Sequence, residues 1–131
     1  MNREIALQEE LGDRTEYTIK QETLVIRFRC DVDHHNALQI RREADRLLEH
    51  SVVRNIVFDF TGVQFMDSSG IGMIMGRYKK VIFTGGKIAV SGVGSEVDRI
   101  LLISGLYRVM SRYDTVEDAL QNIGKKQPGK G

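Results

Sequence analysis

Short apolar runs with strand periodicity alternate along this chain with longer segments of helical periodicity, and this order restricts the possible folds more than any other feature. Two strand-like segments come first, at 17–19 and 24–28. After them, helical and strand-like patterns take turns until a last helical segment ends the series. This order predicts an α/β fold, with a mixed, mostly parallel sheet of about five strands and about four helices joined by right-handed crossovers.

Two of the strand-like segments differ in their pattern of apolar residues. In 24–28, Leu24, Ile26 and Phe28 alternate with Val25 and Arg27, which predicts the second strand of a hairpin. The run at 55–60 is continuously apolar at its centre, which is typical of a strand covered on both faces. We therefore place 55–60 in the middle of the sheet.

Three helix starts carry capping signals. Asp33 is expected to cap a helix that extends to about residue 48, and Thr115, with Asp118 three residues later, is expected to cap the last helix. Ser95, followed by Asp98, has the form of a capping box and is expected to open a third helix. A fourth helix, at 71–82, rests on apolar residues at helical spacing alone.

Composition and charge exclude several classes of protein. The 131 residues contain 41% hydrophobic and 28% charged side chains, which suits one globular domain. The net charge is +1 without a long block of either sign, so we expect neither nucleic acid nor an acidic membrane surface as a partner. A single cysteine, Cys30, and the absence of a signal peptide or an apolar run of ~20 residues predict a cytoplasmic protein.

The ends of the chain differ in composition from its body. Residues 1–14 form a polar leader, 15–124 the folded domain, and 125–131 a basic segment that contains the only proline. We expect this last segment to be a disordered tail.

The most informative segment is Asp67-Ser68-Ser69-Gly70, between the strand at 55–60 and the helix at 71–82. In alternating α/β sheets, loops at the carboxyl ends of strands carry function, because the next helix begins there with free backbone N–H groups. A phosphate on Ser68 or Ser69 would meet these donors. Spacing alone favours a simpler interpretation, in which one serine caps the helix while Gly70 and Gly72 allow close packing.

Other chemistries have weaker support. A catalytic serine needs a neighbouring base, and only His34, His35 and His50 are present, without the Gly-x-Ser-x-Gly elbow. Three scattered histidines and one cysteine make no ligand set, so we expect no metal and no cofactor. The remaining alternative is a small nucleotide-binding or nucleotide-hydrolysing domain that uses Gly92-Val93-Gly94, although the third glycine of that fingerprint is missing. Gly85-Gly86-Lys87 likewise lacks the spacing of a Walker sequence.

Three motifs occur in a characteristic order. They are Asp31-Val32-Asp33-His34-His35, then Phe65-Met66-Asp67-Ser68-Ser69-Gly70-Ile71-Gly72 with Gly76-Arg77-Tyr78-Lys79 after it, and finally Ser104-Gly105-Leu106. Together they resemble the motifs of the anti-sigma factor antagonists, the bacterial STAS domains, over about residues 15–123. The Asp-His-His and Gly-Arg-Tyr-Lys pieces resemble the sporulation-type branch most.

The resemblance implies a phosphorylation switch in a protein that is not an enzyme. In this family the unmodified protein binds an anti-sigma factor, itself a serine kinase, and so frees a sigma factor for transcription. The kinase phosphorylates the serine that directly follows the aspartate, here Ser68, and a phosphatase restores the hydroxyl. The resemblance further implies that Asp33, Asp67, Ser68, Ser69 and Gly70 contact the partner, and a monomer is expected.

Two features depart from the family pattern. Cys30 stands where the family usually has glycine, directly before Asp31, which bears on the local turn. The polar leader before Thr15 is also longer than is usual in the family. Neither departure touches the serine motif.

Overall fold

A single five-stranded sheet organises residues 15–125, which are the residues that the computed structural model describes. Its strands lie in chain order: β1 (Glu16–Lys20), β2 (Thr23–Arg27), β3 (Asn55–Asp59), β4 (Ile88–Ser91) and β5 (Met110–Tyr113). β1 pairs antiparallel with β2, and the pairs from β2 to β5 are parallel. The mixed, mostly parallel sheet predicted from the sequence is confirmed, with β3 at its centre.

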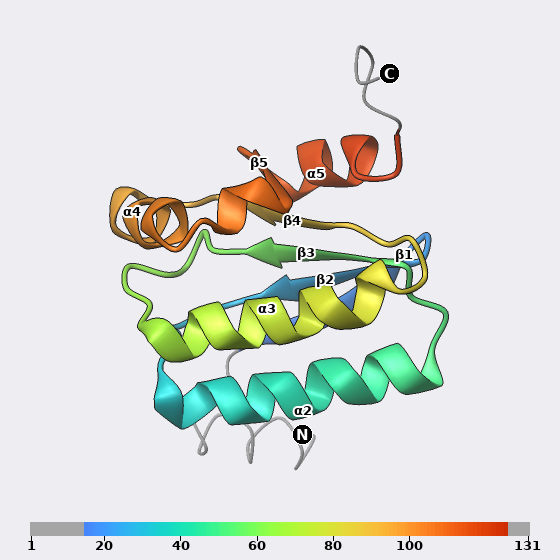
Figure 1. The fold of residues 1–131 in the computed structure, drawn as a ribbon, viewed down its shortest axis with the longest axis horizontal. Coiled ribbons are helices and arrows are strands. Elements are labelled where there is room, and N and C mark those ends of the chain that lie inside the picture. The colour runs from blue at the N-terminus through green and yellow to red at the C-terminus, as the bar shows by residue number, and fades with distance from the viewer. Residues whose placement is uncertain (1–14, 126–131) are drawn as a thin grey trace, which may run out of the picture.

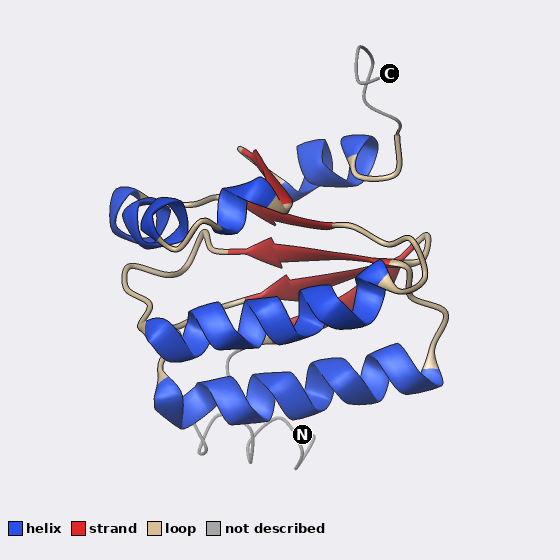
Figure 2. Ribbon diagram, viewed as in Figure 1, coloured by secondary structure: helices blue, strands red, loops and turns tan. Residues whose placement is uncertain are grey.

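Four α-helices and one 3-10 helix accompany the sheet within the described residues. They are α2 (His34–His50), α3 (Ser68–Ile82), α4 (Ser95–Ile103), the 3-10 helix η1 (Leu106–Arg108) and α5 (Val116–Asn122). Figure 1 shows α2 and α3 side by side, with their N-termini at the end of the sheet toward which the parallel strands point. The connections are tan in Figure 2, and the loops that precede α2, α3 and α4 all lie at that end.

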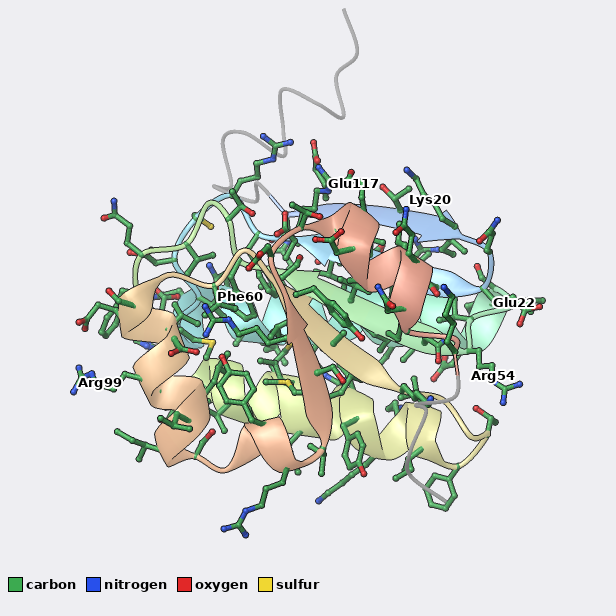
Figure 3. All side chains as sticks on the ribbon, turned by 90° about the horizontal axis from the view of Figure 1, so that it is seen from above. Lys20, Glu22, Arg54, Phe60, Arg99 and Glu117 are labelled. Carbon is green, nitrogen blue, oxygen red and sulfur yellow. The ribbon has the colours of Figure 1, made fainter. Side chains whose placement is uncertain are left out.

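The core has two parts, one on each face of the sheet. The larger part packs β-strand residues such as Ile26 and Phe58 against α2 and α3, and the smaller part packs Val25 and Val57 against α5. In Figure 3, Glu117 of α5 lies on one side of the sheet and α3 on the other. The predicted hairpin is confirmed by the pairing of β1 with β2, and β2 is buried on both faces, which the sequence pattern did not indicate. Val25 is 2% exposed because α5, which is distant in sequence, covers the second face.

Two of the three predicted helix caps are confirmed. The carboxylate of Asp33 caps α2, and the hydroxyl of Thr115 accepts a hydrogen bond from the N–H of Asp118 at 3.1 Å. The third cap was wrong, because Ser95 is already the first residue of α4 and Gly94 precedes it without any side-chain cap bond. Asp98 instead accepts hydrogen bonds from Tyr107 and Arg112, which tie α4 to η1 and β5.

The ends of the chain fall outside these elements. The predicted leader, residues 1–14, and residues 126–131 of the predicted tail lie outside the described residues. Among the helices of residues 15–125, none is long and apolar enough to cross a membrane.

The turn after α3 generates a stability prediction. A Cβ on Gly86 would overlap the carbonyl oxygen of Arg54, whereas a Cβ on Gly76, inside α3, would meet no atom within 4 Å. We expect Gly86→Ala to lower the free energy of unfolding by about 1–3 kcal/mol, because the backbone must move to accept the methyl group. The control, Gly76→Ala, should raise it by up to about 1 kcal/mol through helix propensity. Urea denaturation measures both, and equal midpoints for the two variants would contradict the packing.

Candidate functional site

Two loops at the carboxyl ends of β2 and β3 are joined by backbone hydrogen bonds. The N–H of Val32 donates to the carbonyl of Phe65 at 3.2 Å, and the N–H of Asp67 donates to the carbonyl of Val32 at 3.1 Å. Val32 and Met66 thereby form an isolated parallel bridge beyond the ends of the strands. The residue before α2 and the residue before α3 are held side by side as a result.

Asp31 reinforces this connection from one side. One of its carboxylate oxygens accepts hydrogen bonds from the N–H groups of Gln64 and Phe65, each at 3.0 Å. The cap predicted at Asp33 is present, and Asp31 instead makes this contact between the two loops. The turn at Cys30 is fixed by Asn36, whose side-chain amide donates to the carbonyl of Asp31 at 2.7 Å and approaches the Cys30 sulfur at 3.5 Å.

Asp33 begins α2 with a reciprocal capping box. Its carboxylate accepts from the N–H groups of His35 at 2.9 Å and Asn36 at 3.2 Å, and the Asn36 side chain accepts from the N–H of Asp33 at 3.0 Å. Desolvation, the largest influence, acts to raise the pKa of Asp33. The hydrogen bonds from Asn36 and His35, with the nearby His35 and His34, outweigh it together and hold the pKa below its ordinary value.

Asp67 plays the corresponding role for α3. Its carboxylate accepts from the N–H of Ser69 at 2.8 Å, and Ser68 is already the first helical residue. The simpler sequence interpretation, a serine cap, was therefore wrong. Asp67 has the extended backbone of a cap residue, one position earlier than the serines. Ser68 is exposed, and capping does not engage its hydroxyl.

The two glycines expected to allow close packing differ. A Cβ on Gly70 would overlap the side chain of Met66 and lie 3.2 Å from the Cγ1 of Val32, so α3 approaches the bridged loops only because residue 70 has no side chain. A Cβ on Gly72 would meet no atom within 4 Å. The packing role is confirmed for Gly70 and was wrong for Gly72.

Two histidines lie at the junction of the helix starts. The Nδ1 of His34 lies 4.0 Å from an Asp67 carboxylate oxygen, and the Nδ1 of His35 lies 3.8 Å from Asp33. The two imidazole rings are in contact, with centroids 4.0 Å apart. The sequence placed His34 at the start of its helix, but its contact with Asp67 depends on the bridged loops and has no local signal. The site thus brings together Asp33, Asp67, Ser68 and Ser69, with buried Gly70 behind them.

The alternative nucleotide loop has a packing explanation. A Cβ on Gly92, whose φ is +64°, would overlap the hydroxyl of Thr61 and lie 2.9 Å from the carboxylate of Asp59. That carboxylate accepts hydrogen bonds from the hydroxyls of Ser91 at 3.0 Å and Thr61 at 2.8 Å. The first turn of α4 carries two acidic residues, which oppose a bound phosphate. These features account for Gly92 without a ligand.

A search of residues 15–125 for metal-ligating groups found no cluster of three or more His, Cys, Asp or Glu side chains placed to hold an ion.

Comparison with known proteins identifies a family and close relatives. The sequence model of the STAS domain family matches residues 14–119. An "Anti-sigma F factor antagonist" of Paenibacillus polymyxa is 38% identical over 100 residues, which span 76% of this chain and 86% of the relative. A protein of the same name from Lysinibacillus sphaericus is 31% identical over 88 residues, 67% of this chain and 75% of the relative.

Solved structures with the same fold include both forms of one relative. The phosphorylated form of the Bacillus cell fate determinant SpoIIAA matches with a TM-score of 0.69 and 28% identity, over 83% of this chain and 98% of that one. The unphosphorylated form of the anti-sigma factor antagonist SpoIIAA matches with the same TM-score and 24% identity, over 83% and 96%. The described fold therefore fits the two forms equally well.

The loop contact of Asp31 generates a prediction for the site. We expect Asp31→Ala to lower the free energy of unfolding by about 1–2 kcal/mol, because two backbone N–H groups lose a charged acceptor. Amide exchange at Gln64 and Phe65 should accelerate. Asp114→Ala serves as the control, since Asp114 is exposed and should change stability by less than about 0.5 kcal/mol. Unchanged exchange at both amides would show that Asp31 does not hold the loop.

Proposed function

Because this chain belongs to the STAS domain family and to its anti-sigma factor antagonists, we propose that it is a cytoplasmic switch protein controlled by phosphorylation of Ser68. Its unphosphorylated form binds an anti-sigma factor that is a serine kinase, and thereby frees a sigma factor for transcription. The kinase transfers a phosphate to Ser68, which ends the binding, and a phosphatase removes it. The protein is the substrate of these two enzymes and is a monomer between encounters.

The observation that carries the proposal is the position of Ser68. It is exposed, it is the first residue of α3, and it directly follows the aspartate that caps that helix. Because Asp67 supplies the cap, the hydroxyl of Ser68 is available to a kinase without loss of a helix contact. Exposure also favours Ser68 over Ser69, which is half-buried.

A phosphate on Ser68 is compatible with the fold. The N-terminus of α3 favours negative charge by about 0.3–1 kcal/mol through the helix dipole, while the N–H groups of Ser69 and Gly70 already donate to Asp67. The N-terminus of α2 lies beside it, because Val32 and Asp67 are bridged. His34, 4.0 Å from Asp67, adds a side chain that becomes a cation when protonated. The two helix dipoles and His34 therefore place partial positive charge near Ser68.

The same phosphate opposes binding of the partner. It replaces a neutral hydroxyl with about −1.5 to −2 charges, next to the carboxylates of Asp67 and Asp33. In a docked complex this charge must lose water opposite a kinase that carries nucleotide phosphates. Like charges so placed cost several kcal/mol, and each ~1.4 kcal/mol is tenfold in affinity. Release of the phosphorylated chain from the kinase then requires no change in its fold.

The proposed contact set follows from exposure and packing. Asp33, Asp67, Ser68 and Ser69 lie on the surface of the two helix starts, where a partner reaches them. Gly70 is buried, so its part in binding is the close approach of α3 to Val32 and Met66. A bulkier residue there would displace the whole first turn.

The proposal predicts a single site of phosphate transfer. Incubation with the anti-sigma factor kinase and ATP should add one phosphate to the wild-type chain, located at Ser68 by mass spectrometry of peptides. Ser68→Ala should abolish the transfer, while the matched variant Ser69→Ala should keep it. Transfer to Ser68→Ala, or none to the wild type, is the result that excludes this mechanism.

The proposal also predicts how charge at residue 68 changes affinity. Ser68→Ala should bind the anti-sigma factor as the unmodified protein does, because the hydroxyl contributes no charge. Ser68→Asp should bind at least about tenfold more weakly, a difference of ~1.4 kcal/mol, because a carboxylate is added beside Asp67. Isothermal calorimetry measures both. Equal affinities for the two variants would contradict the electrostatic account.

A further inference from the structure

A groove of about 500 Å³ runs between α2 and α3, starting at Ser69. Its α3 side presents few side chains, because Ser69, Gly72 and Gly76 follow one another along that helix. A Cβ at Gly72 or Gly76 would meet no atom within 4 Å, so the space above them is open. The α2 side carries Leu38, which is 49% exposed, and Arg41. The groove is therefore a shallow channel with an apolar and a cationic side chain on one rim.

A buried cation lines the same groove. Arg77 is 3% exposed, and its Nε lies 2.9 Å from a carboxylate oxygen of Asp45. Its Nη1 donates to the carbonyl of Met73 at 3.4 Å. Among the described residues, the buried Nε of Arg77 makes no hydrogen bond, so its contact with Asp45 is an ion pair alone. A buried guanidinium with unmatched donors favours an added anionic acceptor.

The charges around the groove are unbalanced. Asp45 is shared between Arg77 and Lys80, whose Nζ lies 3.8 Å from its second oxygen, and Arg41 stands on the rim. Burial lowers the pKa of Arg77, Asp45 opposes that change, and the nearby charge of Arg41 lowers the pKa further. One carboxylate thus serves several cations, and no acidic residue is among those of the described chain that line the groove.

We propose that the groove receives an acidic segment of the partner protein, which places an apolar side chain against Leu38 and a carboxylate between Arg41 and Arg77. This inference rests on the proposed function and assigns that segment to the anti-sigma factor. A protein segment is favoured over a free anion because the rim pairs an exposed leucine with the cations. Charge complementarity of this kind sets specificity and the rate of encounter.

The position of the groove links it to the switch. Ser69 lines the groove, and Ser68 is its neighbour in the chain. His34 also lines the groove and lies 4.0 Å from Asp67. Ser68 lies nine residues before Arg77 on α3, about 13.5 Å at 1.5 Å per residue, so its phosphate would act on partner groups at the mouth of the groove and only weakly on a carboxylate held at Arg77.

Two adjacent arginines provide a matched test. Arg41 and Arg42 are both exposed on α2, but only Arg41 lines the groove. Calorimetry with the anti-sigma factor kinase should show at least tenfold weaker binding by Arg41→Glu and less than about twofold change by Arg42→Glu. The difference between the variants should shrink as salt is raised, because the lost contact is ionic.

The other possible results of these binding measurements distinguish the groove from the switch. Equal effects of Arg41→Glu and Arg42→Glu would overturn the groove while leaving the switch at Ser68 in place. If the wild type does not bind the kinase, both the groove and the proposed function are overturned. NMR titration with inorganic phosphate or ATP alone provides a further check. The contrary result is that either anion shifts the amide signals of Gly72 and Gly76 in a saturable way, at concentrations that displace the kinase. That result would show that the groove binds a free anion, and it would contradict our proposal that the groove binds a protein segment.

Discussion

The parallel bridge between Val32 and Met66 is the contact on which the rest of the site depends. It lies beyond the paired strands β2 and β3 and extends their parallel arrangement into the loops. Because of this bridge, the N-termini of α2 and α3 lie side by side, and Asp33 and Asp67 cap neighbouring helices. Without the bridge, the exposed serine would stand at one isolated helix start, with much less positive potential around a phosphate.

In the motif Asp67-Ser68-Ser69-Gly70, different residues carry the structural role and the proposed regulatory role. Asp67 holds the helix start, Gly70 permits its close approach to the bridged loops, and Ser68 is left outside both tasks. The phosphate that we propose on Ser68 would therefore change the charge of the surface without removing a contact from the fold. The fold of this chain matches the phosphorylated and unphosphorylated forms of SpoIIAA with the same TM-score of 0.69.

The sequence predicted features that depend on local pattern and missed those that depend on distant partners. The periodicity of α3 and the cap at Asp33 are local signals, and the structure confirms both. The second buried face of β2 was missed because α5, which covers Val25, is separated from it by most of the chain. The loop contact of Asp31 has no local signal, since the N–H donors of Gln64 and Phe65 lie 33 and 34 residues away, and the groove at Arg77 requires two helices to be placed first.

The central claim is that phosphate on Ser68 alters the charge of the surface and leaves the fold unchanged. Comparison of the ¹H–¹⁵N NMR spectra of the unphosphorylated and the phosphorylated chain tests this most directly. We predict shift changes confined to residues 31–38 and 64–73, with the amide exchange rates of β2 to β5 unchanged. Changes that spread through β4, β5 and α5, or faster exchange in the sheet, would contradict the account.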